Sequence, residues 1–214
     1  MSGDRVTFEL EHCLLRPFVD GDQSAVVRHA NDWAVARWLR DRFPHPYTAA
    51  DADEWVHYAS TALLDTVFAI DIDGEAVGAV GLTIGTDVFR RSAEVGYWLG
   101  RAHWGRGLAP AALAAVSNYA FSELAMLRLF AGVYAGNERS GRVLAKAGYS
   151  PEGVRQAAVV KAGQVLDEHI WVKLAASLPT SDARLAQQEF SSGPNPAVET
   201  PDQVGSPVVS LVGS

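Results

Sequence analysis

A four-residue segment, Trp104-Gly105-Arg106-Gly107, lies between an alternating apolar run at 95–99 and an alanine-rich stretch that begins at Leu108. The alternation predicts a strand and the alanine-rich stretch predicts a helix, so the turn brings the chain to a helix N-terminus. Backbone N–H groups and the helix dipole bind anions at such a position. Because glycine lacks a Cβ, a bulky phosphate can approach the backbone closely. The segment therefore predicts an anion site, and we expect its ligand to be the pyrophosphate of a cofactor.

The composition of the whole chain limits the class of protein. The chain has 214 residues, of which 48% are hydrophobic, and this suits one domain with a substantial core and an extension. No apolar run approaches the ~18–20 residues of a membrane span, and the first residues lack the pattern of a signal peptide. Cys13 is the single cysteine, which excludes an intramolecular disulfide and a cysteine-rich metal site. These features favour the cytoplasm.

The charge of the chain bears on its partners. A net charge of −7 argues against nucleic acid, because phosphate backbones attract basic surfaces. An acidic surface suits a cationic or amine substrate, although many soluble proteins are acidic. The histidines show no metal-ligand spacing, so we expect no metal.

Strands and helices must position the predicted turn. The strands are predicted at 5–16, 67–72, 75–82, 92–100, 127–134, 153–160 and 164–174. The helices are predicted at 25–30, at 32–40, from Thr48, from Leu108, and from Asn137 to Gly148. Asp73-Gly74 and Ala162-Gly163 suit tight hairpin turns, and Cys13 is expected to be a buried strand residue. Residues 177–214 are proline-rich and nearly devoid of aromatic side chains, so we expect a mostly disordered tail.

Four segments, taken in order, carry a family resemblance. They are Glu94-Val95-Gly96-Tyr97-Trp98-Leu99, Trp104-Gly105-Arg106-Gly107-Leu108-Ala109, Asn137-Glu138-Arg139-Ser140 and Lys146-Ala147-Gly148-Tyr149. Together they resemble the GNAT superfamily of acetyl-CoA-dependent N-acetyltransferases, in particular the ribosomal-protein N-terminal acetyltransferases of the RimJ/RimL type. The resemblance implies a domain over residues 5–176. It also implies an α+β fold with a mixed, mostly antiparallel, twisted sheet of six to seven strands and flanking helices.

The resemblance also implies where acetyl-CoA, the acyl donor, binds. The middle strands of the family's sheet splay apart, and the pantetheine arm lies in the gap, where Trp98 and Leu99 would offer backbone groups. Asn137 would contact the cofactor further along. The pyrophosphate would be held by backbone N–H groups of Trp104, Gly105, Arg106, Gly107, Leu108 and Ala109. Family members usually have Gln or Arg at the first position of this turn, where this chain has Trp104. Arg106 is therefore the candidate to place a positive charge near the pyrophosphate.

The implied chemistry is direct attack of a neutral amine on the acetyl thioester, which requires a general base and a group near the leaving thiolate. By resemblance, Glu94 is the candidate base and Ser140 the candidate contact for the thiolate. Many relatives carry a tyrosine seven residues after the motif asparagine, where this chain has Leu144. Asp167, Glu168 and His169 are further candidates to line the amine pocket.

Several alternatives stay open at this stage. The two glycines also suit an ordinary turn, Glu94 a solvated strand residue, Ser140 a local hydrogen-bonding position and Asn137 a helix N-cap. A non-catalytic CoA-binding sensor or interaction module is an alternative function, and so is the same chemistry with another acyl-CoA. The acceptor is either a small-molecule amine or a protein N-terminus, and the chain is expected to be a monomer or a homodimer.

Overall fold

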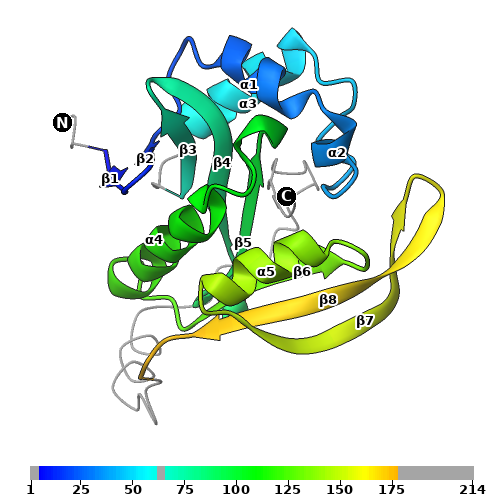
Figure 1. Cartoon of the computed structure of the whole chain (residues 1–214). Helices are drawn as coiled ribbons and strands as arrows, with labels where there is room; N and C mark the ends of the chain where they lie inside the picture. The colour runs from blue at the N-terminus through cyan, green and yellow to red at the C-terminus, as the bar shows by residue number, and fades with distance from the viewer. Residues whose placement is uncertain (1–4, 62–65, 178–214) are drawn as a thin grey trace, which may run out of the picture.

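Eight strands form one mixed sheet in the order β1-β2-β3-β4-β5-β6-β8-β7 in the computed structural model, which describes residues 5–61 and 66–177 (Figure 1). The strands are β1 (Phe8–Glu9), β2 (Leu14–Arg16), β3 (Val67–Ile72), β4 (Glu75–Ile84), β5 (Ser92–Leu99), β6 (Arg128–Tyr134), β7 (Ser150–Lys161) and β8 (Gln164–Leu174). The sheet thus exceeds the expected six to seven strands. The reason is that the single strand predicted at 5–16 is broken into β1 and β2 by a turn in which the Leu10 N–H donates to the Cys13 carbonyl.

The strands β5 and β6 separate along their length. They form the one parallel pair of the described sheet, and their pairing covers only Ser92–Glu94 against Arg128–Phe130. Beyond that point β5 continues to pair with β4, and β6 continues to pair with β8. A gap therefore opens between residues 95–99 and residues 131–134, as the resemblance implied.

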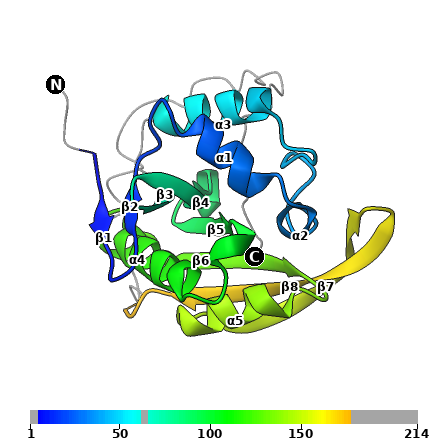
Figure 2. The same cartoon turned by 45° about the horizontal axis from the view of Figure 1, so that its top comes forward.

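Helices cover both faces of the sheet (Figure 2). One face packs against α1 (Gln23–Ala30), α2 (Trp33–Ala36) and α3 (Ala49–Thr61), and the other against α4 (Leu108–Ser122) and α5 (Glu138–Lys146). Because side chains alternate along a strand, β5 contributes to both cores. Val95, Tyr97 and Leu99 lie in the core of α4 and α5, whereas Trp98 lies in the core of α1–α3.

Local sequence signals account for several element boundaries. Thr48 and Asp51 form the expected reciprocal cap of α3, with the Thr48 N–H donating to Asp51 Oδ2 at 2.7 Å and the Asp51 N–H to Thr48 Oγ1 at 3.3 Å. The turns at Asp73-Gly74 and Ala162-Gly163 have positive φ at both residues, as tight hairpin turns require.

Other boundaries differ from the sequence prediction. The helix expected at 32–40 is only the four-residue α2, which the Asp32 side chain caps, and turns follow it up to Leu39. Cys13 is buried but lies in the turn just before β2 rather than in a strand. Residues 178–214, which hold almost all of the expected tail, lie outside the described residues. No helix in the described part of the chain is long and apolar enough to cross a membrane.

Candidate active site

The turn at 104–107 leads directly into α4. Gly107 is the N-cap of α4 and has a left-handed φ of 79°, and Gly105 has a φ of 77°. A Cβ at either glycine would meet no atom of the described chain within 4 Å, so open space faces the turn. Pro110 has no N–H, and the Ala111 N–H donates to the Gly107 carbonyl, so the N–H groups of Leu108 and Ala109 are the ones that helix geometry leaves for a ligand.

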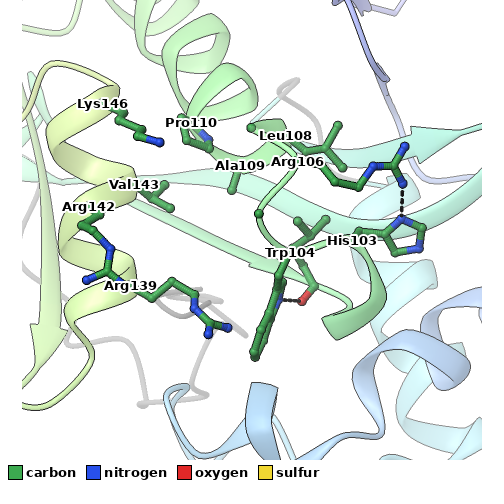
Figure 3. Close-up of a pocket in the computed structure, with 13 residues that line it drawn as sticks. His103, Trp104, Arg106, Leu108, Ala109, Pro110, Arg139, Arg142, Val143 and Lys146 are labelled. Carbon is green, nitrogen blue, oxygen red and sulfur yellow. Dashed lines mark hydrogen bonds between the residues drawn. The ribbon is translucent and has the colours of Figure 1, made fainter.

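Cationic side chains of α5 face this turn. A pocket of about 410 Å³ is lined on one side by residues 103–110 and on the other by Arg139, Arg142 and Lys146. Figure 3 shows Arg139 and Lys146 extending from α5 toward Trp104 and Pro110. These three side chains recur at helical spacing, so they share one face of α5. The pocket is therefore electropositive although the whole chain has a net charge of −7.

Trp104 joins the turn to both neighbouring elements. Its Nε1–H donates to the Leu99 carbonyl at 2.7 Å, and the Arg139 guanidinium lies 4.1 Å from the centroid of its ring. The carbonyl of Leu99, one of the backbone groups predicted to meet the pantetheine arm, thus already has a partner. The side chain of Trp98 points to the other face, where it packs edge-on against Phe43.

Asn137 caps α5 with its side-chain oxygen, while its side-chain nitrogen has no partner among the described residues. Its Oδ1 accepts from the Ser140 N–H at 3.3 Å, so the N-cap interpretation of this residue holds. Its Nδ2 is buried and has no hydrogen-bond partner among the described residues. Because an unsatisfied buried donor is unfavourable, Nδ2 is a candidate hydrogen-bond donor to a ligand. Asn137 lines two pockets at the α5 N-terminus, one of about 260 Å³ and one of about 370 Å³.

Ser140 lies in the first turn of α5 and is fully buried. Its Oγ lies 2.7 Å from the hydroxyl of Tyr97, which is also fully buried. Burial is the main cause that raises the pKa of Tyr97 above its ordinary value, so this phenol stays neutral. The structure therefore brings Ser140 to the splayed part of β5, through Tyr97.

Glu94 lies where the two strands begin to separate. It pairs with Phe130, the last residue of β6 that pairs with β5. Its side chain is 15% exposed, and its Oε1 accepts from Arg40 Nη2 at 2.7 Å. Glu94 is thus a largely buried, paired carboxylate rather than a solvated strand residue. It faces the α1–α3 side of the sheet, the side opposite the buried Tyr97.

Three functional candidates were not identified from the sequence, namely the α5 cations Arg139, Arg142 and Lys146. Their helical spacing after Asn137 was available as a signal. Which face of α5 would meet the glycine turn depended on tertiary packing. Of the further candidates, Glu168 lies over Gly132 of β6, where a Cβ would come within 2.1 Å of its Oε1. Asp167 instead accepts from the Ala157 N–H in the β7–β8 hairpin.

A sheet that splays at its parallel pair, followed by a glycine turn at a helix N-terminus, defines an acyl-CoA N-acyltransferase fold. The chain belongs to the GNAT acetyltransferase family, because the model of the acetyltransferase (GNAT) domain matches residues 12–150. The prediction of an N-acetyltransferase is therefore confirmed at the level of the protein family.

Comparisons with individual proteins agree with this assignment. The probable N-acetyltransferase YjcK of Bacillus subtilis is 32% identical over 148 residues, which are 69% of this chain and 76% of that protein. The spermidine N(1)-acetyltransferase of Escherichia coli is 31% identical over 144 residues, 65% of this chain and 73% of that protein. The structure of Mycobacterium smegmatis RimJ in complex with CoA-disulfide shares the fold, with a TM-score of 0.70, 24% identity and coverage of 87% of this chain and 96% of that chain.

Proposed function

We propose that this protein transfers the acetyl group of acetyl-CoA to a primary amine. The observation that carries the proposal is the left-handed glycine turn at the N-terminus of α4, which opens into a pocket lined by the α5 cations. This arrangement suits a pyrophosphate, because helix N–H groups and arginines both stabilise phosphate oxygens.

The residues present fit the remainder of the donor. The buried Nδ2 of Asn137 has no partner among the described residues and would donate to a carbonyl of the pantetheine arm. The gap between β5 and β6 leads from this point into the sheet. Acetyl-CoA supplies a thioester-bound acetyl group, and the relative RimJ was solved with CoA-disulfide.

The acceptor amine would reach the thioester from the Glu94 side of the sheet. The Glu94 carboxylate would bind the ammonium group and take one of its protons. The amine nitrogen would then bond to the acetyl carbon as the carbon–sulfur bond breaks, and a second proton would pass from that nitrogen to the departing thiolate. On the other face, the Ser140 hydroxyl, which lies 2.7 Å from the Tyr97 hydroxyl, adjoins the splayed segment of β5 and would stabilise the departing thiolate.

Replacement of Gly107 by Trp tests the donor site. The side chain would enter the open space in front of the turn, so we expect calorimetric acetyl-CoA binding to be lost while the circular dichroism spectrum is retained. Gly74→Trp is the matched control, because Gly74 also has a left-handed φ, of 84°, and open space, but lies in the β3–β4 turn. Unchanged affinity in Gly107→Trp would contradict this placement of the pyrophosphate.

A thiol-release assay with acetyl-CoA and a panel of amines separates the enzyme from a non-catalytic CoA-binding module. Turnover that requires both substrates supports the proposal. Binding of acetyl-CoA without turnover on any amine supports the module. Replacing acetyl-CoA by propionyl-CoA in the same assay tests the alternative of another acyl group.

A further inference from the structure

A second pocket, of about 420 Å³, contains Glu94 and lies apart from the phosphate pocket. The two pockets share no lining residue. The second one is bordered by the ends of β4 and β5, the 3₁₀ turn η1 (Asp87–Phe89), β6 and the β7–β8 hairpin. Since Glu94 marks the point where β5 and β6 begin to separate, this pocket adjoins the place where the amine must meet the thioester.

The pocket has an apolar wall. Phe89, Phe130 and Ile170 all line it. Phe89 is 69% exposed, although it is one of the largest apolar side chains of the protein. Its turn is held in place, because the Gly85 N–H donates to the Ser92 carbonyl at 2.8 Å and a Cβ on Gly85 would meet the Phe89 carbonyl at 2.5 Å. An aromatic ring at the rim of a cavity offers contact area to a ligand.

The two carboxylates of the pocket differ in whether they have an oxygen left to accept a hydrogen bond from a ligand. Both carboxylate oxygens of Glu152 are bound by Arg128, at 2.7 and 2.5 Å. Glu94 uses Oε1 for Arg40, which leaves Oε2 to accept from a ligand. The lining as a whole holds two carboxylates and two guanidinium groups, so it has no excess negative charge with which to select a polycation.

We propose that this pocket binds the acceptor, and that the acceptor is a primary amine flanked by a bulky apolar group. The ammonium group binds Glu94, and the apolar group contacts Phe89 and Phe130. This inference rests on the proposed acetyl transfer and narrows its acceptor. Such chemistry is found both in small arylalkylamines and in the N-termini of peptides that begin with a large apolar residue.

The test compares two neighbouring exposed residues. Phe89→Ala removes the ring from the pocket rim, whereas Val88→Ala, at a residue that is 73% exposed and outside the lining, is the matched control. The amines are 2-phenylethylamine, a peptide beginning with Phe, a peptide beginning with Gly, and spermidine. We expect 2-phenylethylamine or the Phe peptide to exceed spermidine and the Gly peptide in kcat/KM by about tenfold or more, the usual effect of apolar contacts in a specificity pocket.

Phe89→Ala should lower kcat/KM for the preferred amine about tenfold and leave the Kd of CoA unchanged, and Val88→Ala should change neither. Preference for 2-phenylethylamine alone identifies a small-molecule source, and preference for the Phe peptide alone identifies a protein N-terminus. A preference for spermidine, or equal effects of the two variants, overturns the inference.

A binding measurement separates failure of this inference from failure of the proposed function. If no amine is acetylated, the acetyl-transfer proposal fails, but calorimetry of 2-phenylethylamine and the Phe peptide with the CoA-saturated protein still reports on the pocket. Binding that Phe89→Ala weakens and Val88→Ala does not supports the pocket assignment. The absence of binding by both probes overturns it.

Discussion

The Tyr97 hydroxyl oxygen lies 2.7 Å from Ser140 Oγ and 3.3 Å from the Ser140 carbonyl oxygen. This contact joins the splayed part of β5 to the first turn of α5, and both residues are fully buried. The residue proposed to act near the thiolate is therefore also a structural contact. Its two roles can be separated, because the hydroxyl of Tyr97 keeps the Ser140 carbonyl as an acceptor when Oγ is removed.

Ser140→Ala should reduce stability by only about 1 kcal/mol, the usual net value of one hydrogen bond. If Ser140 acts at the thiolate, kcat should fall by about tenfold or more while the Kd of acetyl-CoA changes little. Tyr97→Phe is the control, because it removes the same hydrogen bond and leaves the serine hydroxyl in place. Equal losses of kcat in the two variants would assign Ser140 a purely structural role.

Asn137→Ser should weaken the binding of CoA about tenfold without a large loss of stability. Serine is a good N-cap, so α5 keeps its cap, but the donor Nδ2 is lost. One hydrogen bond of about 1.4 kcal/mol corresponds to tenfold in affinity. Isothermal titration calorimetry and thermal unfolding of the same preparations measure the two effects. Unchanged affinity with lowered stability would limit Asn137 to capping.

The double variant Arg142→Gln and Lys146→Gln should raise the Kd of CoA and make it less dependent on salt. Both cations line the phosphate pocket, and salt screens the attraction of such exposed charges for phosphate groups. Titrations at low and high ionic strength measure the slope with which the Kd of CoA changes with salt concentration. Arg91→Gln, whose side chain donates to the Ala125 carbonyl and lies outside the pocket, is the control. An equal slope in the wild type and the double variant would exclude these cations from phosphate binding.

His103 predicts a pH dependence of folding stability. Burial, followed by His29 and Arg106, lowers the pKa of His103 below its ordinary value of 6.5, and Glu75 opposes this only in part. As the pH falls through about 6.5, the unfolded chain takes up a proton at this residue before the folded chain does, so folding loses stability toward acid. His103→Gln should flatten this part of the profile, measured by urea unfolding between pH 7.5 and 5.5.

The control for that profile is His57→Gln, at an exposed residue of α3. In this variant, the free energy of unfolding should change between pH 7.5 and pH 5.5 by the same amount as in the wild type. A His103→Gln profile that runs parallel to the wild type would show that other groups cause the pH dependence.

Short-range patterns allowed much of the fold to be predicted. Asp73-Gly74, Thr48 with Asp51, and Asn137 with Ser140 form their turns and caps among residues a few positions apart, so the sequence alone contains the interaction. The strand predicted at 5–16 is in fact broken into β1 and β2, and the break was missed because the turn between them lacks the glycine or proline that usually marks one.

The sequence by itself determined that a glycine turn precedes α4 and that Asn137 begins α5, since backbone conformation and capping depend on neighbouring residues. Only the tertiary structure decided that the α5 cations face that turn, that Arg40 pairs with Glu94, and that Phe89 lies at the rim of the same pocket as Glu94. The Arg40–Glu94 pair joins residues 54 positions apart. Such contacts arise from the packing of helices and strands on both faces of the sheet, which no local pattern specifies.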